Sequence, residues 1–242
     1  VVAWEFGFKR GLDTRHVASI TYFRKTFRNQ IDAKTLIPFD SKSAGNYGFA
    51  SYVNNAQARA IGVEFVISRE RDESFNGSVL YSYMTTEGTS ENVSQGIHYA
   101  QWGFPVPAVP FALSWDQRHT LKVDVEGRLP LDVQSNLVAL YNSPRPYTFY
   151  PTRDGFTPLD PNKMFVPNNR RMKDVVMVNM KIAKEFPLGM FAKATLYADM
   201  RNLLNKRNVR WIDSSGRIGG ELGDPGAFYE LRRIRVGMRL EF

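Results

Sequence analysis

The sequence predicts an all-β fold, an antiparallel up-and-down transmembrane β-barrel. Two observations lead to this prediction. Residues of alternating polarity recur in nine segments, as expected of strands whose two faces meet different surroundings. The connections between these segments alternate between tight turns and long loops, which is typical of outer-membrane barrels with short periplasmic turns and long extracellular loops.

The composition excludes several other classes of protein. The chain has 242 residues, and its 17 Phe, 11 Tyr and 4 Trp argue against extensive disorder. No apolar stretch approaches the roughly 20 residues that a transmembrane helix needs. Because there is no cysteine, the chain can form neither a disulfide-stapled scaffold nor a thiolate metal site.

Each predicted strand has one apolar face and one more polar face. The last one, for example, alternates Ile234, Val236 and Met238 with arginines. The alternation is least regular in the second, because Arg24 and Lys25 place a charge on each face. In chain order, the predicted strands cover residues 1–9, about 17–28, 57–70, 75–86, 119–127, 133–142, 174–185, 191–203 and 233–242.

The connections separate a membrane barrel from a soluble sandwich, which alternation alone does not do. Every other connection is a loop of about 20 residues or more, whereas compact domains usually join elements with about 4 to 6. The short connections are residues 10–14, 71–74, 128–132 and 186–189, and the long ones are 29–55, 87–118, 143–173 and 205–227. One end of the sheet therefore has only short turns, and the other end carries all the long loops.

The two ends of the chain add a further expectation. Val1 opens directly into a strand without an initiator Met or a signal sequence, and the last alternating run stops on Phe242. Bacterial single-chain barrels have even strand numbers, so nine strands predict that the first one pairs with sequence upstream of Val1 or with another chain. We expect residues 1–242 to be the carboxyl-terminal part of one barrel domain that lacks its amino-terminal strands.

Several segments, taken in order, resemble the TonB-dependent receptors of the outer membrane. Residues 55–65, NAQARAIGVEF, are similar to a strand motif of that family with Ala, Gly and Glu at fixed spacing. Residues 198–207, ADMRNLLNKR, are similar to its penultimate strand, and a glycine-rich loop and a strand ending in Phe follow. The segments between them that stand in the family's order are Tyr81-Ser82-Tyr83, Arg118-His119 and residues 143–148, SPRPYT.

The resemblance implies a larger assembly. This chain would supply about strands 14 to 22 of a 22-stranded barrel whose lumen holds an amino-terminal plug. Implied partners are that plug, the missing strands, the inner-membrane TonB system acting through the plug, the outer-membrane lipid, and the assembly machinery that reads the last strand with Phe242. Neither the plug nor the TonB box appears in this sequence, and no cofactor is implied.

Four loop aromatics and one loop arginine are the candidate ligand contacts. Pro105, Pro107 and Pro110 stiffen the loop 87–118, and the alternative to ligand contact is packing of the loop on its neighbours or at the membrane interface. The candidates in this and the next long loop are Tyr99, Trp102, Trp115, Arg145 and Tyr147.

Charged residues on the polar faces are the candidates for the lumen. We expect them to form ion pairs along the wall or to face the plug, and a path for anions through the lumen is the alternative. These residues are Glu64, Asp124, Asp199, Arg201, Arg235 and Arg239.

Other chemistries are disfavoured. His16, His98 and His119 are the only histidines and are too scattered for a metal triad, and Ser114 with His119 lacks a third orienting group, so no catalytic or metal site is expected. The net charge of +8 is dispersed without an aromatic platform, which disfavours nucleic acid.

The function that these observations favour is transport. We expect a receptor in the bacterial outer membrane that binds a scarce small solute or metal chelate at its extracellular side and passes it to the periplasm, without covalent chemistry. The alternatives are a structural or adhesive barrel that holds a surface partner, and a passive porin. The solute, whether siderophore, cobalamin, saccharide or peptide, stays open.

Overall fold

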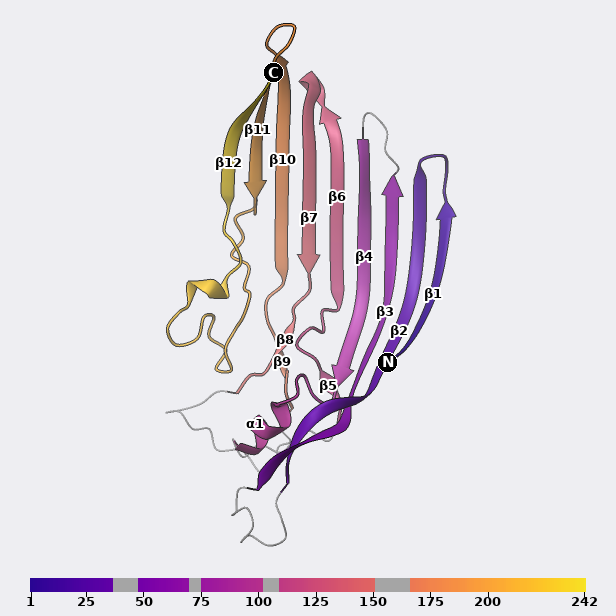
Figure 1. The fold of residues 1–242 in the computed structure, drawn as a ribbon, viewed down its shortest axis with the longest axis vertical. Helices are drawn as coiled ribbons and strands as arrows, with labels where there is room; N and C mark the ends of the chain where they lie inside the picture. The colour runs from indigo at the N-terminus through magenta and orange to yellow at the C-terminus, as the bar shows by residue number, and fades with distance from the viewer. Residues whose placement is uncertain (37–47, 70–74, 102–108, 151–165) are drawn as a thin grey trace.

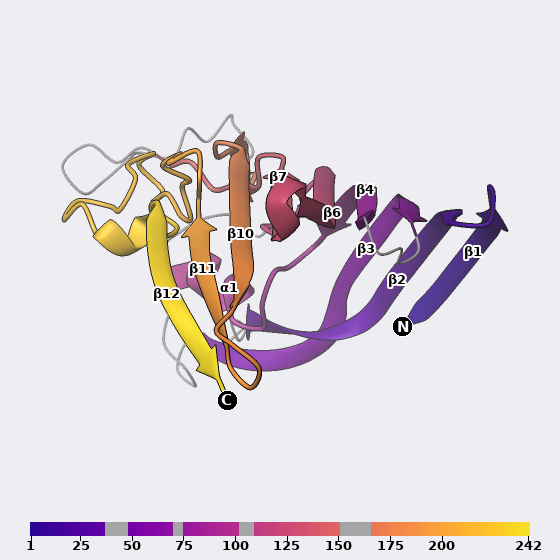
Figure 2. The ribbon, with the colours of Figure 1, turned by 90° about the horizontal axis from the view of Figure 1, so that it is seen from above.

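The computed structural model describes residues 1–36, 48–69, 75–101, 109–150 and 166–242. Its main feature is one antiparallel sheet in which each long strand pairs with the next along the chain (Figure 1). The order is β1-β2-β3-β4-β6-β7-β10-β11-β12, and the short β5 pairs with the end of β4. Seen from above, the sheet is a curved wall with β1 and β12 at opposite ends (Figure 2).

All nine predicted strands are confirmed. The long strands are β1 (Val2–Gly11), β2 (His16–Leu36), β3 (Phe49–Arg69), β4 (Phe75–Gly88), β6 (His119–Leu129), β7 (Val133–Asn142), β10 (Val175–Pro187), β11 (Lys193–Arg201) and β12 (Arg233–Glu241). The short elements are α1 (Gln95–Gln101), β5 (Phe111–Ala112), β8 (Pro146–Tyr147), β9 (Arg170–Arg171) and two 3₁₀ turns, Pro130–Asp132 and Pro225–Ala227. No helix in these described ranges is long and apolar enough to cross a membrane.

The hairpin of β2 and β3 is longer than predicted. The expected loop over 29–55 was wrong in part, because β2 continues to Leu36 and pairs there with Phe49 of β3. A register shift between Phe27 and Gln30 interrupts the pairing, and Asn29 has a positive φ of 56°. Beyond this bulge the hairpin extends past β1 and β4 (Figure 1). Its sequence lacks the regular polar and apolar alternation on which the prediction depended.

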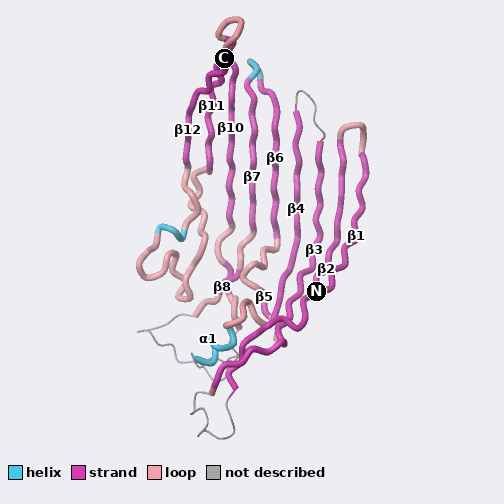
Figure 3. The backbone as a smooth tube through the Cα atoms, viewed as in Figure 1, coloured by secondary structure: helices cyan, strands magenta, loops and turns pink. Residues whose placement is uncertain are grey.

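The two ends of the wall differ, as the lengths of the connections predicted. The described turns at one end are tight, whereas α1, β5, β8, β9 and the described parts of the long loops lie at the other end (Figure 1, Figure 3). We call these the turn end and the loop end. At the turn end, the carboxylate of Asp13 accepts hydrogen bonds from the backbone N–H groups of Arg15 and His16, at 2.7 and 2.8 Å.

The buried apolar core is small and lies toward the loop end. Phe111 and Leu113, from the segment after α1, pack with Ala58 of β3, and Phe27 of β2 lies against them. This cluster attaches the loop 87–118 to the wall. A second attachment is α1, which lies so close to β2 that a side chain at Gly96 would collide with the carbonyl oxygen of Ala33.

Candidate functional site

The wall has a polar face. A polar groove of about 710 Å³ crosses β7, β10, β11 and β12, and Asp199, Arg201 and Arg239 line it. Arg235 stands directly opposite Asp199 in the ladder, so the two side chains share this face. The structure therefore brings four of the six lumen candidates together.

The other two lumen candidates lie on the same face, nearer β1. The side-chain amide of Asn136, which lines the polar groove, donates to the Asp124 carboxylate at 3.2 Å. In the ladder, Asp124 stands opposite Ser78 of β4, and Glu64 stands opposite Ser82, four residues further along that strand. Because side chains alternate between faces every residue, Glu64 and Asp124 are on one side of the wall.

The opposite face is apolar. A depression of about 260 Å³ between β10, β11 and β12 is lined by side chains such as Ile182, Leu196 and Val236. Large apolar side chains continue on this face to the other edge, where Trp4 and Phe6 of β1 are 59% and 64% exposed. So wide an exposed apolar surface is expected where a protein meets lipid.

One loop candidate meets the polar face. Trp115 and Glu64 line the same cavity of about 320 Å³, together with Lys25 and Glu5. Lys25 Nζ lies 3.3 Å from the Glu5 carboxylate, whereas Glu64 has no ion pair or hydrogen bond among the described residues. The cavity thus combines an aromatic surface with an unpaired carboxylate.

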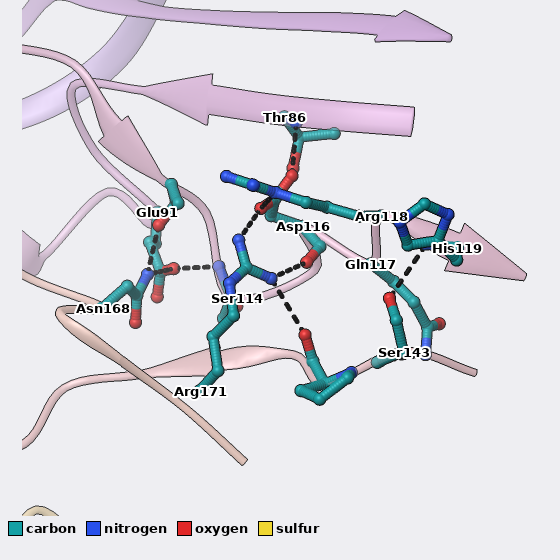
Figure 4. Close-up of polar contacts among 12 residues, drawn as sticks. Thr86, Glu91, Ser114, Asp116, Gln117, Arg118, His119, Ser143, Asn168 and Arg171 are labelled. Carbon is teal, nitrogen blue, oxygen red and sulfur yellow. Dashed lines mark hydrogen bonds and ion pairs between the residues drawn. The ribbon is translucent and has the colours of Figure 1, made fainter. Parts of the chain in front are cut away.

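The residue after Trp115 in the chain, Asp116, has a buried carboxylate that joins two long loops to the wall (Figure 4). The side chain of Asp116 is 2% exposed. It accepts a hydrogen bond from the backbone N–H of Thr86 in β4 at 2.7 Å and forms ion pairs with Arg171 and, at 3.5 Å, with Arg118. We call these four residues the Asp116 cluster.

Arg171 belongs to the second long loop and extends the Asp116 cluster to it. Its guanidinium donates to the backbone carbonyl oxygens of Asp116 at 3.0 Å and Pro144 at 2.9 Å. A parallel connection runs through Glu91, whose carboxylate accepts hydrogen bonds from the Ser114 backbone and the Asn168 side chain (Figure 4). The described parts of the loops 87–118 and 143–173 are therefore joined to each other.

The other loop candidates are dispersed. Tyr99 lies in α1, where burial raises its pKa to about 12 and the Gln95 side chain donates to its hydroxyl at 2.6 Å. Arg145 donates to the backbone carbonyl of Arg210, at 3.1 Å. Tyr147 pairs with Arg170 in the small sheet of β8 and β9. Trp102 lies outside the described residues.

The segment after β11 contains two buried asparagines. Asn208 is 1% exposed, and its side chain accepts from the Val176 N–H at 3.0 Å and donates to the Val176 carbonyl at 2.7 Å. Asn202, also 1% exposed, donates to the backbone carbonyls of Lys206 and Glu230. Asn202 of the motif in residues 198–207 and Asn208 just after it therefore have a structural role, because they hold the last loop together and fasten it to β10.

The histidines do not converge. His16 contacts Asp13 in a turn at 2.8 Å, and His119 contacts the Tyr81 hydroxyl at 2.8 Å on the apolar face. No described contact joins Ser114 to His119. Within the ranges that the structure describes, no group of three or more His, Asp or Glu residues could hold a metal ion.

Sequence reasoning missed the Asp116 cluster. Asp116 and Arg171 are 55 residues apart, and neither belongs to an alternating segment. The available signal was weak: a lone acidic residue between Trp115 and a strand start, and a pair of arginines before another strand.

A curved antiparallel wall with one polar face, one apolar face and long loops at one end is the architecture of an outer-membrane β-barrel. A family model described as TonB dependent receptor-like, beta-barrel matches residues 1–203. The chain belongs to this family, as the motifs suggested. Membership places it in the outer membrane, so that the apolar face meets lipid and the polar face meets the lumen.

Solved structures agree on the fold. The chain is similar to the outer-membrane transporter YddB from Escherichia coli, with 12% identity, a TM-score of 0.65 and coverage of 99% of this chain and 32% of the other. The ferric-catecholate import receptor Fiu from E. coli K12 is 14% identical, with a TM-score of 0.57 and coverage of 99% of this chain and 27% of the other. The ferric enterobactin receptor PfeA from Pseudomonas aeruginosa is 18% identical, with a TM-score of 0.57 and coverage of 99% of this chain and 30% of the other. The chain thus spans about a third or less of the length of these proteins. No curated protein sequence matches it.

Proposed function

We propose that this chain is the carboxyl-terminal barrel portion of a TonB-dependent outer-membrane receptor. The receptor binds a scarce solute at its extracellular side and transports it to the periplasm. Upstream strands complete the barrel, and an upstream plug connects it to the inner-membrane TonB system.

The observation that carries the proposal is the cavity shared by Trp115 and Glu64. A side chain from an extracellular loop and a side chain from the lumen wall line one space. A solute captured by the loops would therefore meet the wall at the entrance of the lumen. The adjoining Asp116 cluster holds Trp115 in place, because it fixes the next residue of the chain to β4 and to the second loop.

The class of solute that we propose is a small metal chelate. Several structural neighbours are described as a ferric-catecholate import receptor, a ferric enterobactin receptor and a ferric citrate transporter. The rigid aromatic surface of Trp115 suits an aromatic or amphipathic chelate, since Trp offers a large apolar area at low cost in side-chain entropy. The candidates Tyr99, Trp102, Arg145 and Tyr147 are proposed contacts of the outer rim.

The test measures binding and uptake of ferric chelates by cells in which the full-length receptor is the only TonB-dependent receptor expressed. Ferric catecholate, ferric citrate and ferric pyoverdine with radiolabelled iron serve as probes. Trp115→Ala should weaken binding of the recognised chelate about tenfold or more, as expected for an aromatic anchor at a binding site. Trp4→Ala, on the lipid side, is the matched control and should change binding little.

The outcomes separate the proposed function from its alternatives. Uptake that disappears without TonB supports a TonB-dependent transporter. Uptake that persists without TonB and does not saturate would indicate a passive porin. Binding of none of the probes, with a macromolecule retained at the surface instead, would indicate an adhesive barrel.

A further inference from the structure

The extension of the β2–β3 hairpin has one strand edge without a partner strand. β3 pairs with β2 from Phe49 onward, but its pairing with β4 begins only at Ala58, opposite Gly88, and just before it Gln57 bonds to Thr89. Over residues 49–56, the side of β3 that faces away from β2 pairs with no other described strand. A free strand edge presents a row of backbone N–H and C=O groups and is therefore a template for pairing with another chain.

The other edge of the extension, on β2, is covered. The Asp32 carboxylate accepts a hydrogen bond from the backbone N–H of Ala33 at 2.9 Å, and both residues are buried. The carbonyl oxygen of Ala33 lies against Gly96 of α1. Because the N–H and C=O groups of one strand residue point to the same edge, both groups of Ala33 point away from β3.

The orientation of Ala33 determines the orientation of its partner in β3. Ala33 stands opposite Tyr52, and two opposite residues of an antiparallel pair either exchange both hydrogen bonds or both point outward. The N–H and C=O groups of Tyr52 therefore point to the free edge, and those of Ala50 and Asn54, two residues to either side, point the same way. All three residues are exposed. Each of them offers one donor and one acceptor to a neighbouring strand.

The sequence of this edge does not oppose pairing. Natural proteins blunt free edges with charged residues, with proline or with a covering element. Residues 49–58, FASYVNNAQA, contain neither a charged residue nor a proline. On the β2 side, by contrast, the extension carries Asp32 and Lys34 and is covered by α1. The chain thus protects one edge of the extension and leaves the other edge open.

We propose that residues 49–55 bind an extended segment of another protein by β-strand addition at the extracellular loop end. This mode of binding requires a regular row of backbone N–H and C=O groups in the partner, which a polypeptide supplies and a lipid or a saccharide does not. The main-chain hydrogen bonds provide the affinity, and alternate side chains beside Tyr52 provide the selectivity. These residues do not line the cavity of Trp115 and Glu64, so this site is separate from the proposed solute site.

The first test is hydrogen exchange of the full-length receptor in detergent. In the free receptor, the amides of Ala50, Tyr52 and Asn54 should exchange rapidly, whereas those of Ser51 and Val53, which pair with β2, should be protected. The probe is a synthetic peptide of seven alternating Thr and Val residues with blocked ends, which offers an extended and uncharged backbone. Titration with this peptide should slow the exchange of the three edge amides about tenfold or more.

Variants of Tyr52 separate the backbone of the edge from its side chains. Tyr52→Pro removes one edge N–H and keeps the pairing with β2, because a strand tolerates proline where the N–H faces outward. It should weaken binding of the peptide about tenfold, since one hydrogen bond is lost and the proline ring obstructs the added strand. Tyr52→Thr is the matched control, and it should change binding by less than about threefold because it keeps the N–H. Ala50→Pro repeats the test at a second edge position.

A chemical control does not depend on any variant. The same peptide with every backbone nitrogen methylated has no N–H donors and should not bind to the unmodified receptor. Assembly of each variant is checked by the heat-dependent mobility of the folded barrel in gel electrophoresis.

Three results would overturn the proposal. Edge amides that are already protected in the free full-length receptor would mean that another segment of the same chain covers the edge. A dimer of the free receptor that dissociates in the Tyr52→Pro variant would mean that a second copy occupies it. Equal binding of the methylated and unmethylated peptides would mean that the peptide does not bind by strand addition.

Discussion

The loop end and the turn end of this wall are built from the same chain but are held together by different means. At the turn end, the described connections are short and make local contacts, such as those of Asp13 with the two amides that follow it. At the loop end, buried polar side chains join segments that are far apart in sequence, as Asp116 joins β4 to Arg171. The described turns only reverse the chain, whereas the described parts of the loops contact one another and the wall through buried side chains. We call this part of the molecule the loop layer.

This difference predicts where the substitution of a single side chain should lower the stability of the structure. A buried charge that loses its partner is costly, whereas an exposed ion pair contributes little. Asp116, Asn202 and Asn208 are each 1% exposed, and all three lie at the loop end. We therefore expect the loop end to be sensitive to single substitutions and the turn end to tolerate them.

The largest effect is expected for Asp116→Ala. It leaves Arg171 and the Thr86 amide without their carboxylate, and breaking a buried ion pair typically costs about 3 to 5 kcal/mol. The measurement is hydrogen exchange of the loops 87–118 and 143–173 in the full-length receptor, where protection should fall in both. Asp132→Ala at the turn end, where the Asp132 side chain is 85% exposed, is the control and should have little effect. An equal loss of protection in the Asp116 and Asp132 variants would show that the loop end is no more sensitive to substitution than the turn end.

An intermediate effect is expected for Asn208→Ala. This change leaves the N–H and carbonyl of Val176 without the partner that the buried Asn208 side chain supplies, at a cost of about 1 to 3 kcal/mol. Denaturant unfolding of the refolded receptor measures it, and limited proteolysis should show faster cleavage in residues 205–227. Asn76→Ala, in β4 near the turn end, is the matched control. No change in either measurement would mean that the last loop is held by other contacts.

The smallest effect concerns the turn of Asp13 and depends on pH. The backbone N–H of Arg15, together with His16, lowers the pKa of Asp13 from 3.8 to about 2. Because the pKa in the folded turn is below the ordinary value, the stabilisation is complete above pH about 4 and is lost as the pH falls toward 2. The protection of the Arg15 and His16 amides, relative to the exchange of an unfolded chain at the same pH, should fall over this range while the loop end keeps its protection. Simultaneous loss of amide protection at the turn end and the loop end would show that the two ends do not unfold independently.

The sequence predicted the wall well and the loop layer poorly, for one physical reason. In this wall the alternation is regular where each strand separates an apolar face from a polar face, so all nine strands were recognised within that zone. The extension of β2 and β3 beyond Phe27 lies past the end of β1, and side chains such as Asn29, Gln30 and Asp32 follow no lipid-imposed pattern. Its strand structure was therefore missed.

The candidate site shows the same limit. Periodicity alone placed Glu64 and Asp199 on the polar face of their strands, and the structure puts them on the polar face of the wall. The position of Trp115 against that face depends on Asp116, whose partners lie in other segments. Contacts between distant loops leave no period in a single sequence, so this part of the site required the structure.

The buried connection between Asp116 and Arg171 has a consequence for engineering. Moving only the loop 87–118 into another barrel of this family would leave Asp116 facing a foreign second loop, without its arginine. The energetic effects of changes in the two loops should therefore not add, because they share one buried partner. Experiments that transplant or randomise these loops should therefore transfer residues 87–118 and 143–173 together as a single cassette.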